Sequence, residues 1–296
     1  MKKLLIASLI LSIGLVAGAG KALALPVTIS LDAIYDWGTS YALAGSTWTA
    51  ATSNPYFPAG AGQPQGFTDG VQKAADGLED SYGIFRVNTM KVGTTKIFDR
   101  ATSAFELTGM FYGFDDIYLN GTMSNATIFS VGGSVDLYQD YAKNYSDTSP
   151  FGPQSTGTGG GRYDINAGQG DGFLLATDGT NVLNLTPRLL TDGNTGIQYT
   201  LRSVFDFNST SGSGSMVLDV AGGSWGPFWD TDTLPEPNGD ADMLLDYTSV
   251  NTGPNGWLIE AGGTARGNIV PEPASMAIFG IGLLGVGARF RKKRLA

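Results

Sequence analysis

The chain has 296 residues, with 18 Lys and Arg against 27 Asp and Glu, and it contains neither cysteine nor histidine. These absences exclude disulfides, thiol nucleophiles, imidazole bases and metal sites built on sulfur or imidazole. Ten basic residues and all the acidic ones lie between residues 25 and 288, which gives this stretch a net charge of −17. So acidic a body repels nucleic acid, which proteins bind mainly through Lys and Arg.

The first residues predict a secretory signal peptide, residues 1–24. Lysines precede an apolar stretch at 4–16, and Ala22 and Ala24 form the small-x-small pattern at which signal peptidase cuts. Cleavage after Ala24 would start the mature chain at Leu25. An uncleaved membrane anchor is the alternative, but the short apolar stretch favours removal.

The mature body begins with an alternating run at 27–31, which predicts an early strand. Residues 71–78 form the one predicted helix of the body. Aromatic and β-branched segments bounded by Gly, Asn or Asp then predict five strands, at 83–90, 104–112, 116–119, 126–131 and 134–138. Aromatic residues before the helix could stack on sugar rings, although core packing is their ordinary role. They are Tyr35, Trp37, Tyr41, Trp48, Tyr56 and Phe57.

The clearest strand pattern lies at 197–207, where the odd positions are almost all apolar and the even ones mostly polar. A Gly/Ser loop at 209–215 follows, and the alternation resumes at 216–220. Together these segments predict an antiparallel hairpin with Phe205 and Phe207 in the core. Two more strands are predicted at 243–250 and 256–260.

Many short strands, 43 glycines and little helical periodicity predict an all-β fold. We expect an antiparallel β-sandwich, of which a jelly roll is one form. The Gly-rich stretch at 150–161 is interpreted as a long loop inside a single domain that covers residues 25–269. A boundary between two domains is the alternative for that stretch.

A cluster of oxygen ligands makes Asp230, Asp232, Asp240 and Asp242 the candidate metal site. Without His and Cys, the remaining oxygen ligands select hard ions such as calcium. The spacing does not fit an EF-hand loop, because Leu234 stands where the third ligand should be. Solvated turns are the alternative, since Asp and Asn are also ordinary turn residues.

The last 27 residues form a unit of three parts. Pro271, Glu272 and Pro273 form an extended, rigid turn, because Pro fixes φ and lacks an N–H donor. The apolar segment 274–288 would make a helix of about 22 Å, short of a hydrocarbon core of about 30 Å. It therefore suits a temporary membrane stop, with the basic residues at 289–294 remaining cytoplasmic.

This arrangement resembles the PEP-CTERM sorting signal, which exosortase enzymes read in Gram-negative bacteria that make exopolysaccharide. The resemblance implies export through the inner membrane, a transient stay there, and processing by an exosortase-type enzyme. The product would reach the cell surface or the outside of a Gram-negative cell. Four segments of the body, at 105–111, 134–140, 170–176 and 205–207, are similar to flocculation-associated PEP-CTERM proteins. That resemblance implies a role in flocs or biofilms that are held together by exopolysaccharide.

The expected function is therefore that of an exported, non-enzymatic surface or matrix protein associated with exopolysaccharide. One alternative is a carbohydrate-active hydrolase that uses a pair of carboxylates, a mechanism that needs neither His nor Cys. A buried carboxyl with a strongly shifted pKa in a cleft would favour it. The other alternative is a calcium-dependent sugar-binding module.

Overall fold

A computed structural model describes most of the body, and its elements are strands with a single short helix. The described residues are 24–38, 40–50, 66–76, 80–143, 145, 179–251 and 259–270. The main sheet contains β1 (Leu25–Gly38), β5 (Ser81–Val92), β6 (Thr95–Asp99), β7 (Glu106–Thr122), β8 (Asn125–Asp140), β9 (Thr180–Pro187), β12 (Leu201–Asp206), β13 (Ser211–Gly222), β14 (Met243–Asn251) and β15 (Ile259–Ile269). The smaller elements are β2 (Tyr41–Ala44), β3 (Thr47–Ala50), β4 (Phe67–Thr68), β10 (Leu190–Thr191), β11 (Gln198–Tyr199) and helix α3 (Gly226–Trp229).

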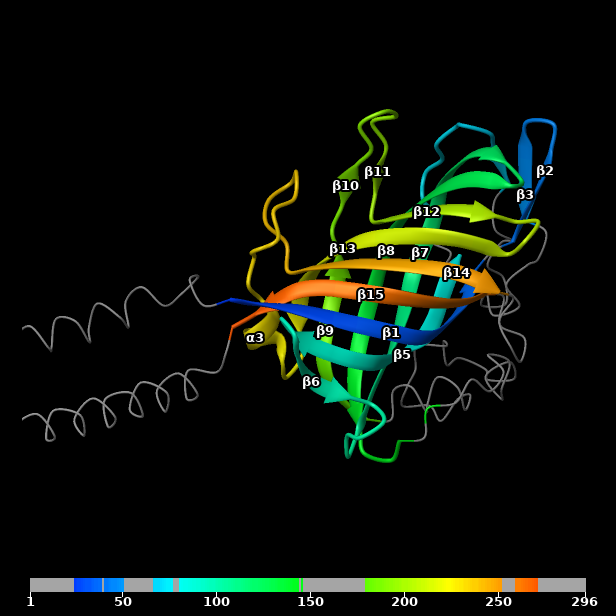
Figure 1. The fold of residues 1–296 in the computed structure, drawn as a ribbon. Helices are drawn as coiled ribbons and strands as arrows, with labels where there is room; N and C mark the ends of the chain where they lie inside the picture. The colour runs from blue at the N-terminus through cyan, green and yellow to red at the C-terminus, as the bar shows by residue number, and fades with distance from the viewer. Residues whose placement is uncertain are drawn as a thin grey trace, which may run out of the picture.

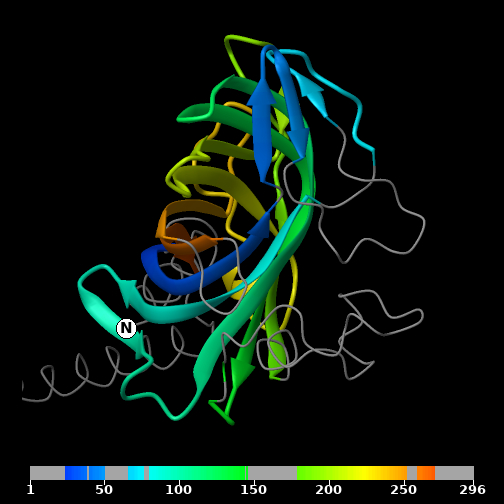
Figure 2. The same cartoon turned by 90° about the vertical axis from the view of Figure 1, so that its right-hand side faces the viewer.

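The main sheet closes on itself into a barrel of eight antiparallel strands (Figures 1 and 2). Around the ring the order is β1, β15, β14, β13, β12, β8, β7 and β5, and β5 pairs with β1 again. The all-β, antiparallel prediction is confirmed, but the predicted sandwich is wrong because the sheet has closed. Apolar and polar residues alternate with the same period in a sandwich and in a barrel, so the sequence pattern does not separate the two.

The long strands β7 and β8 each cover two of the predicted strands, because glycines that suggested strand ends are bends within the strands. β7 has 17 residues and β8 has 16. Gly113 in β7 and Gly132 and Gly133 in β8 have φ values of 77°, 73° and 95°. This region favours glycine, and glycine inside a strand often marks a bulge or a corner of a barrel. The bends let the hairpin of β7 and β8 curve with the barrel wall (Figure 2).

The predicted hairpin exists as the pairing of β12 with β13, but in a different register. Residues 211–215, predicted as a loop, are strand and pair with β12, whereas 216–220 pair with β14 and β9. Phe205 is 8% exposed in the barrel core, as predicted. Phe207 is partly buried and packs on it, with ring centroids 5.0 Å apart. A Cβ on Gly212 would lie 2.5 Å from the Phe205 ring, so the glycine at this position allows close packing on Phe205.

Helix α3 lies at one end of the barrel, where it packs against β9, β13 and β15. Its last residue, Trp229, is 4% exposed and belongs to the main core cluster. The helix predicted at 71–78 is wrong over its described part, because residues 71–76 have no regular secondary structure. In the described ranges of the chain, no helix is both long enough and apolar enough to cross a membrane.

The three-stranded sheet of β2, β3 and β4 packs against the far end of the β7–β8 hairpin. Tyr41 and Trp48 are almost fully buried there, against Leu119 of β7. The indole N–H of Trp48 donates to the Asp69 carboxylate at 3.1 Å, so the buried ring keeps a hydrogen-bond partner. This small sheet therefore extends the core beyond the ring.

Candidate functional site

The two ends of the body meet at one rim of the barrel. Ala24 directly precedes β1, and β15 ends at Ile269. The two strands are neighbours, with Leu25 paired to Ile269. The N–H of Val270 donates to the carbonyl of Phe228 in α3 at 2.8 Å, so the chain is held against the barrel through this residue. The segments predicted for removal therefore lie outside the strands that close the ring.

A cavity of about 40 Å³ lies within the barrel, and all eight strands of the ring contribute to its lining. Most of the lining is apolar, including Phe85, Phe111 and Leu245. Asp36, Ser81 and Tyr247 supply its polar groups. A buried water needs about 10–15 Å³ and several polar partners, so the cavity has room for a few waters near these three residues.

The carboxyl of Asp36 accepts a hydrogen bond from the Ser81 hydroxyl at 2.9 Å. Burial raises the pKa of Asp36 to about 7; the bond from Ser81 opposes this rise, and the charge of Asp116 adds to it. The hydroxyls of Tyr247 and Ser203 share a hydrogen bond of 2.8 Å. Burial also raises the pKa of Tyr247, and the charge of Asp36 adds to that rise. Asp36 is therefore poised to hold a proton near neutral pH.

Asp116 is the second carboxyl of this interior region. It accepts hydrogen bonds from Ser130 at 2.7 Å and from Tyr41 at 3.0 Å. Burial raises the pKa of Asp116 to about 6, although both bonds oppose the rise. Neither Asp36 nor Asp116 was predicted from the sequence, because neither belongs to a motif; the sole signal was that each interrupts an apolar run in a strand.

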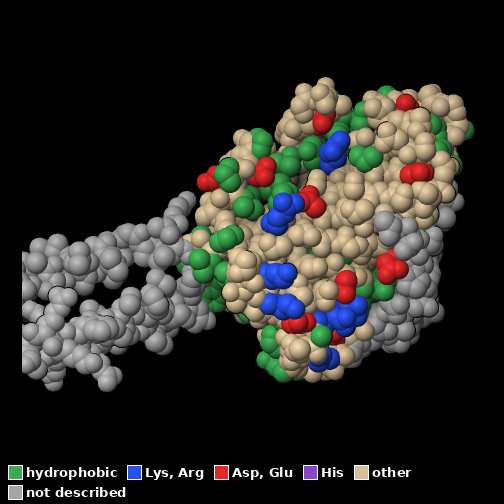
Figure 3. All heavy atoms as spheres, viewed as in Figure 1, with side chains coloured by type: hydrophobic (Ala, Val, Ile, Leu, Met, Phe, Trp, Pro, Cys, Tyr) green, Lys and Arg blue, Asp and Glu red, His purple; other side chains and the backbone are tan. Residues whose placement is uncertain are grey.

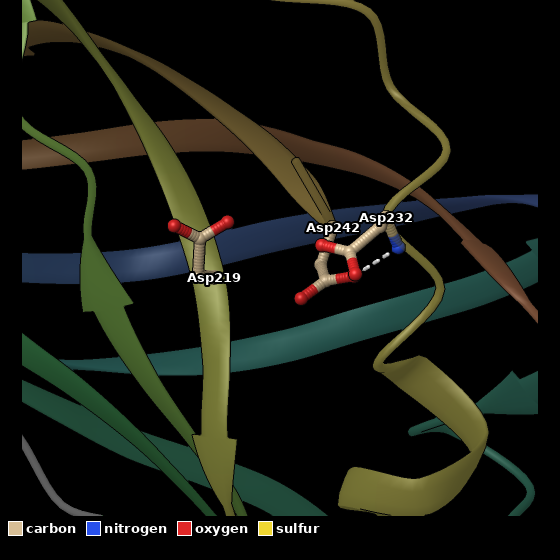
Figure 4. Close-up of side chains that lie close together, drawn as sticks. All are labelled: Asp219, Asp232 and Asp242. Atoms are coloured by element: carbon tan, nitrogen blue, oxygen red, sulfur yellow. Dashed lines mark hydrogen bonds between the residues drawn. The ribbon is translucent and has the colours of Figure 1, made fainter. Parts of the chain in front are cut away.

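The predicted metal site is only partly assembled (Figure 4). Asp232 and Asp242 come together, and Asp219 of β13, which was not among the predicted ligands, completes the group. One carboxylate oxygen from each lies within 4.8 Å of the others. The other two predicted ligands, Asp230 and Asp240, are exposed and lie outside this group. A partial loss of hydration raises the pKa of the exposed Asp230, and the charge of the nearby Asp242 adds to the rise.

Most oxygens of this acidic cluster already have protein partners. Arg188 holds Asp219 with two hydrogen bonds, Nε to Oδ2 at 2.8 Å and Nη2 to Oδ1 at 2.6 Å. Asp242 is 2% exposed. It accepts main-chain N–H bonds of 2.8, 2.6 and 2.7 Å from Val220, Thr231 and Asp232. Because calcium takes six to eight oxygen ligands, the cluster fits a structural role better than that of a calcium site.

The comparisons with known proteins concern the segment that follows β15. A family model for the PEP-CTERM protein-sorting motif matches residues 270–292. This segment of the chain is thus a PEP-CTERM sorting motif. No curated protein and no solved structure matches the chain.

The PEP-CTERM signal therefore begins at the residue that is tied to α3. The predicted sorting residues Pro271, Glu272 and Pro273 fall within the matched stretch. These three residues, Ala22 and the predicted apolar tail lie outside the described residues. The signal implies export through the inner membrane, processing by exosortase, which is a membrane enzyme, and sorting to the surface.

The aromatic residues between 35 and 57, for which core packing was the ordinary expectation and sugar stacking the alternative, are core residues wherever their side chains are described. Tyr35, Tyr41 and Trp48 are 7%, 1% and 0% exposed. The side chain of Trp37 and residues Tyr56 and Phe57 lie outside the described part. Buried rings cannot stack on a polymer, so the described residues of this region offer no platform for sugars.

Proposed function

We propose that this PEP-CTERM protein is an exported, non-enzymatic protein of the cell surface or extracellular matrix that associates with exopolysaccharide. The observation that carries the proposal is the sorting signal, which begins directly after the last strand of a closed barrel. In this proposal the barrel is the part of the protein that reaches the cell surface, and the sorting signal is the part that is removed. More specifically, we propose that the protein acts in the flocs or biofilms of a Gram-negative bacterium that makes exopolysaccharide.

Processing of the tail is the first test. We expect the protein from the envelope or medium of the native host to have lost its signal peptide and to end at or near Pro271, Glu272 and Pro273. Intact-mass measurement reads both ends at once. A variant with Pro271→Ala and Pro273→Ala should retain the tail and accumulate in the inner membrane. If most wild-type molecules end at Ala296, the proposal of tail removal is wrong.

Association with the polymer is the second test. The purified, processed protein should sediment with the producer's own exopolysaccharide, and a strain that lacks the protein should form weaker flocs that the added protein restores. A strain with unchanged flocs, together with a protein that stays in the supernatant, would refute the matrix role while leaving the sorting route intact.

A hydrolase that uses paired carboxylates is the second candidate, and the raised pKa values of Asp36 and Asp116 favour it. The size of the site opposes it, because the cavity measures about 40 Å³ and pockets for small molecules usually have about 300–1,000 Å³. Release of reducing sugar from the producer's polymer, lost in Asp36→Asn, would establish the hydrolase. No release by the wild-type protein would exclude it for that polymer.

We propose weak calcium binding at the cluster of Asp219, Asp232 and Asp242. This set replaces the four ligands that were expected from the sequence. Its measurement is a pair of melting curves at fixed ionic strength, with millimolar calcium or with chelator. Asp232→Asn is the informative variant, because Asp242 also supports the fold. Equal melting temperatures in both conditions would leave the cluster with its structural role alone.

A further inference from the structure

The few basic residues of the body are concentrated on one part of the barrel wall. Ten Lys and Arg residues lie between residues 25 and 269. Six of them lie on the neighbouring strands β6, β5, β1 and β15 or on the loops that flank β7 and β8. These six are Arg86, Lys91, Lys96, Arg100, Lys143 and Arg266. Figure 3 shows blue side chains gathered over β1, β5 and β6 on the face toward the viewer.

Three of these cations form a row across four adjacent strands. Lys96 of β6 pairs with Lys91 of β5, Lys91 pairs with Thr28 of β1, and Thr28 pairs with Arg266 of β15. All four residues are exposed. With neighbouring strands about 4.8 Å apart, the row extends about 14 Å across the outside of the barrel. We call Lys96, Lys91, Thr28 and Arg266 the cationic row.

Acids pair with the cations at the two ends of the row but not with the cation in its middle. Lys96 and Arg266, at its two ends, pair with Asp99 at 2.6 Å and with Asp246 at 2.7 Å. Lys91, in the middle, makes no ion pair within the described residues. Lys91 and Lys96 also lie directly opposite each other, an arrangement of like charges that destabilises a hairpin. A protein with a net charge of −17 between residues 25 and 288 thus keeps three exposed cations in a row on one face, of which Lys91 has no ion pair within the described residues.

The residues beside the cationic row carry hydroxyl groups. In the next outward-facing row, Thr89 of β5 pairs with Ser30 of β1, and Ser30 pairs with Thr264 of β15. Asp99 of β6 and Asp246 of β14, the ion-pair partners of Lys96 and Arg266, stand at the two ends of this row. Hydroxyls donate and accept hydrogen bonds, as sugar hydroxyls do. A surface that binds lipid bilayers buries large apolar side chains as well as using cations, and neither row contains an apolar residue. The two rows therefore fit a polymer of acidic sugars better than a bilayer.

We infer that the cationic row and the hydroxyl row beside it bind an anionic polysaccharide whose carboxylates meet Lys91, Lys96 and Arg266. This inference rests on the proposed function and names the surface and the polymer class for it. The acidic remainder of the body repels such a polymer, so attraction is confined to this face. The polymer would lie across the strands, along the row, with its hydroxyls against Ser30, Thr89 and Thr264.

The test uses the processed protein from the native host, immobilised alginate as the polyuronate probe, and dextran as a neutral probe. The triple variant Lys91→Gln, Lys96→Gln and Arg266→Gln should bind alginate about tenfold or more weakly at low salt, since exposed charges contribute little individually but add together. Arg202→Gln is the matched control, because Arg202 is also exposed on a barrel strand, β12, outside the row. It should change binding less than about twofold.

Salt and a charge-conserving substitution distinguish binding through charge from binding to neutral sugar or to lipid. Wild-type binding to alginate should fall steeply as salt rises, because exposed charges are screened, and Lys91→Arg should retain the binding of the wild type. Alginate binding that is equal in the triple variant and the wild type would overturn the inference. The inference would also be overturned if the wild type bound dextran as tightly as alginate. The same holds if it bound phosphatidylglycerol vesicles but not alginate.

The producer's own exopolysaccharide separates the proposed function from the proposed binding surface. If the wild type binds this polymer and the triple variant binds it equally well, the proposed function stands and the cationic row is not its surface. If the wild type binds neither this polymer nor alginate, the proposed function itself fails. Melting curves of each variant confirm that the fold is intact, as expected for exposed side chains.

Discussion

At the scale of single residues, Asp242 shows how one carboxylate organises a loop. Its two oxygens accept three main-chain N–H groups that come from β13 and from the segment after α3. The cluster that resembled a metal site in the sequence is therefore explained largely by hydrogen bonding to the chain itself. Acidic residues that cap main-chain donors and acidic residues that hold a cation look alike in a sequence, because both are Asp in a loop.

Asp242→Ala should destabilise the protein by about 3 kcal/mol, because three main-chain donors, one buried and two partly buried, would lose a charged acceptor. Chemical denaturation measures the change in the free energy of unfolding. Asp240→Ala is the control, since its side chain is exposed and the effect should stay within about 0.5 kcal/mol. Equal effects of the two substitutions would contradict the capping role of Asp242.

Stability should also depend on the protonation of Asp36. Its pKa in the folded protein is about 7, above the ordinary value of 3.8, chiefly because of burial. Between these two pH values the folded state binds more protons than the unfolded state, so its stability falls as pH rises, by up to about 1.4 kcal/mol per pH unit. Asp116, whose pKa is about 6, should add to this slope.

Unfolding free energies at pH 4.5 and pH 7.5 test the dependence. Asp36→Asn should flatten it, because the amide cannot ionise. Asp206→Asn is the matched control: hydrogen bonds to Ser209 and Asn208 hold the pKa of Asp206 below its usual value, so it is ionised over this whole range. A wild-type protein that gains stability between these pH values would disprove the assignment.

At the scale of elements, the β12–β13 hairpin tests the core. Phe205 is 8% exposed and packs against Phe207 and Gly212. Phe205→Ala should cost about 3–5 kcal/mol, as large-to-small core substitutions do. Val204→Ala is a neighbouring control on the opposite face of β12, where the side chain is only partly buried, and it should cost clearly less. A similar loss for both variants would mean that the burial of the two faces has been assigned wrongly.

The sequence predicts individual strands well and their arrangement less well, for identifiable reasons. Alternation located β1 and β12, because half-buried strands expose one face to water, and aromatic and β-branched composition located β5. The same composition rule divided β7 and β8 in two at glycines that are bends in the structure. The closing pair β1–β15 joins residues about as far apart in the body as the chain allows, and no local pattern encodes such a pairing. The interior carboxyls were missed for the same reason, since strands remote in sequence bring them together.

At the scale of the whole molecule, the ring depends on its last strand. β15 pairs with both β14 and β1. Without it, the wall would have two open edges and the apolar interior would meet water. A chain that ends at residue 258 should therefore lose cooperative unfolding and bind a dye for exposed apolar surface, whereas one that ends at residue 270 should melt in a single transition. Cooperative melting of the shorter chain would show that the barrel is complete without β15.

The pairing of Leu25 with Ile269 also determines how the molecule responds to tension. A force that pulls these two residues apart acts across β1 and β15 rather than along them. The hydrogen bonds between β1 and β15 would then break one after another, starting at the rim, and at low force. If the two strands were instead pulled along their length, many inter-strand hydrogen bonds would bear the force at the same time. A molecule attached at both ends would therefore open first between β1 and β15. Removal of either terminal segment takes away one of these two points of attachment.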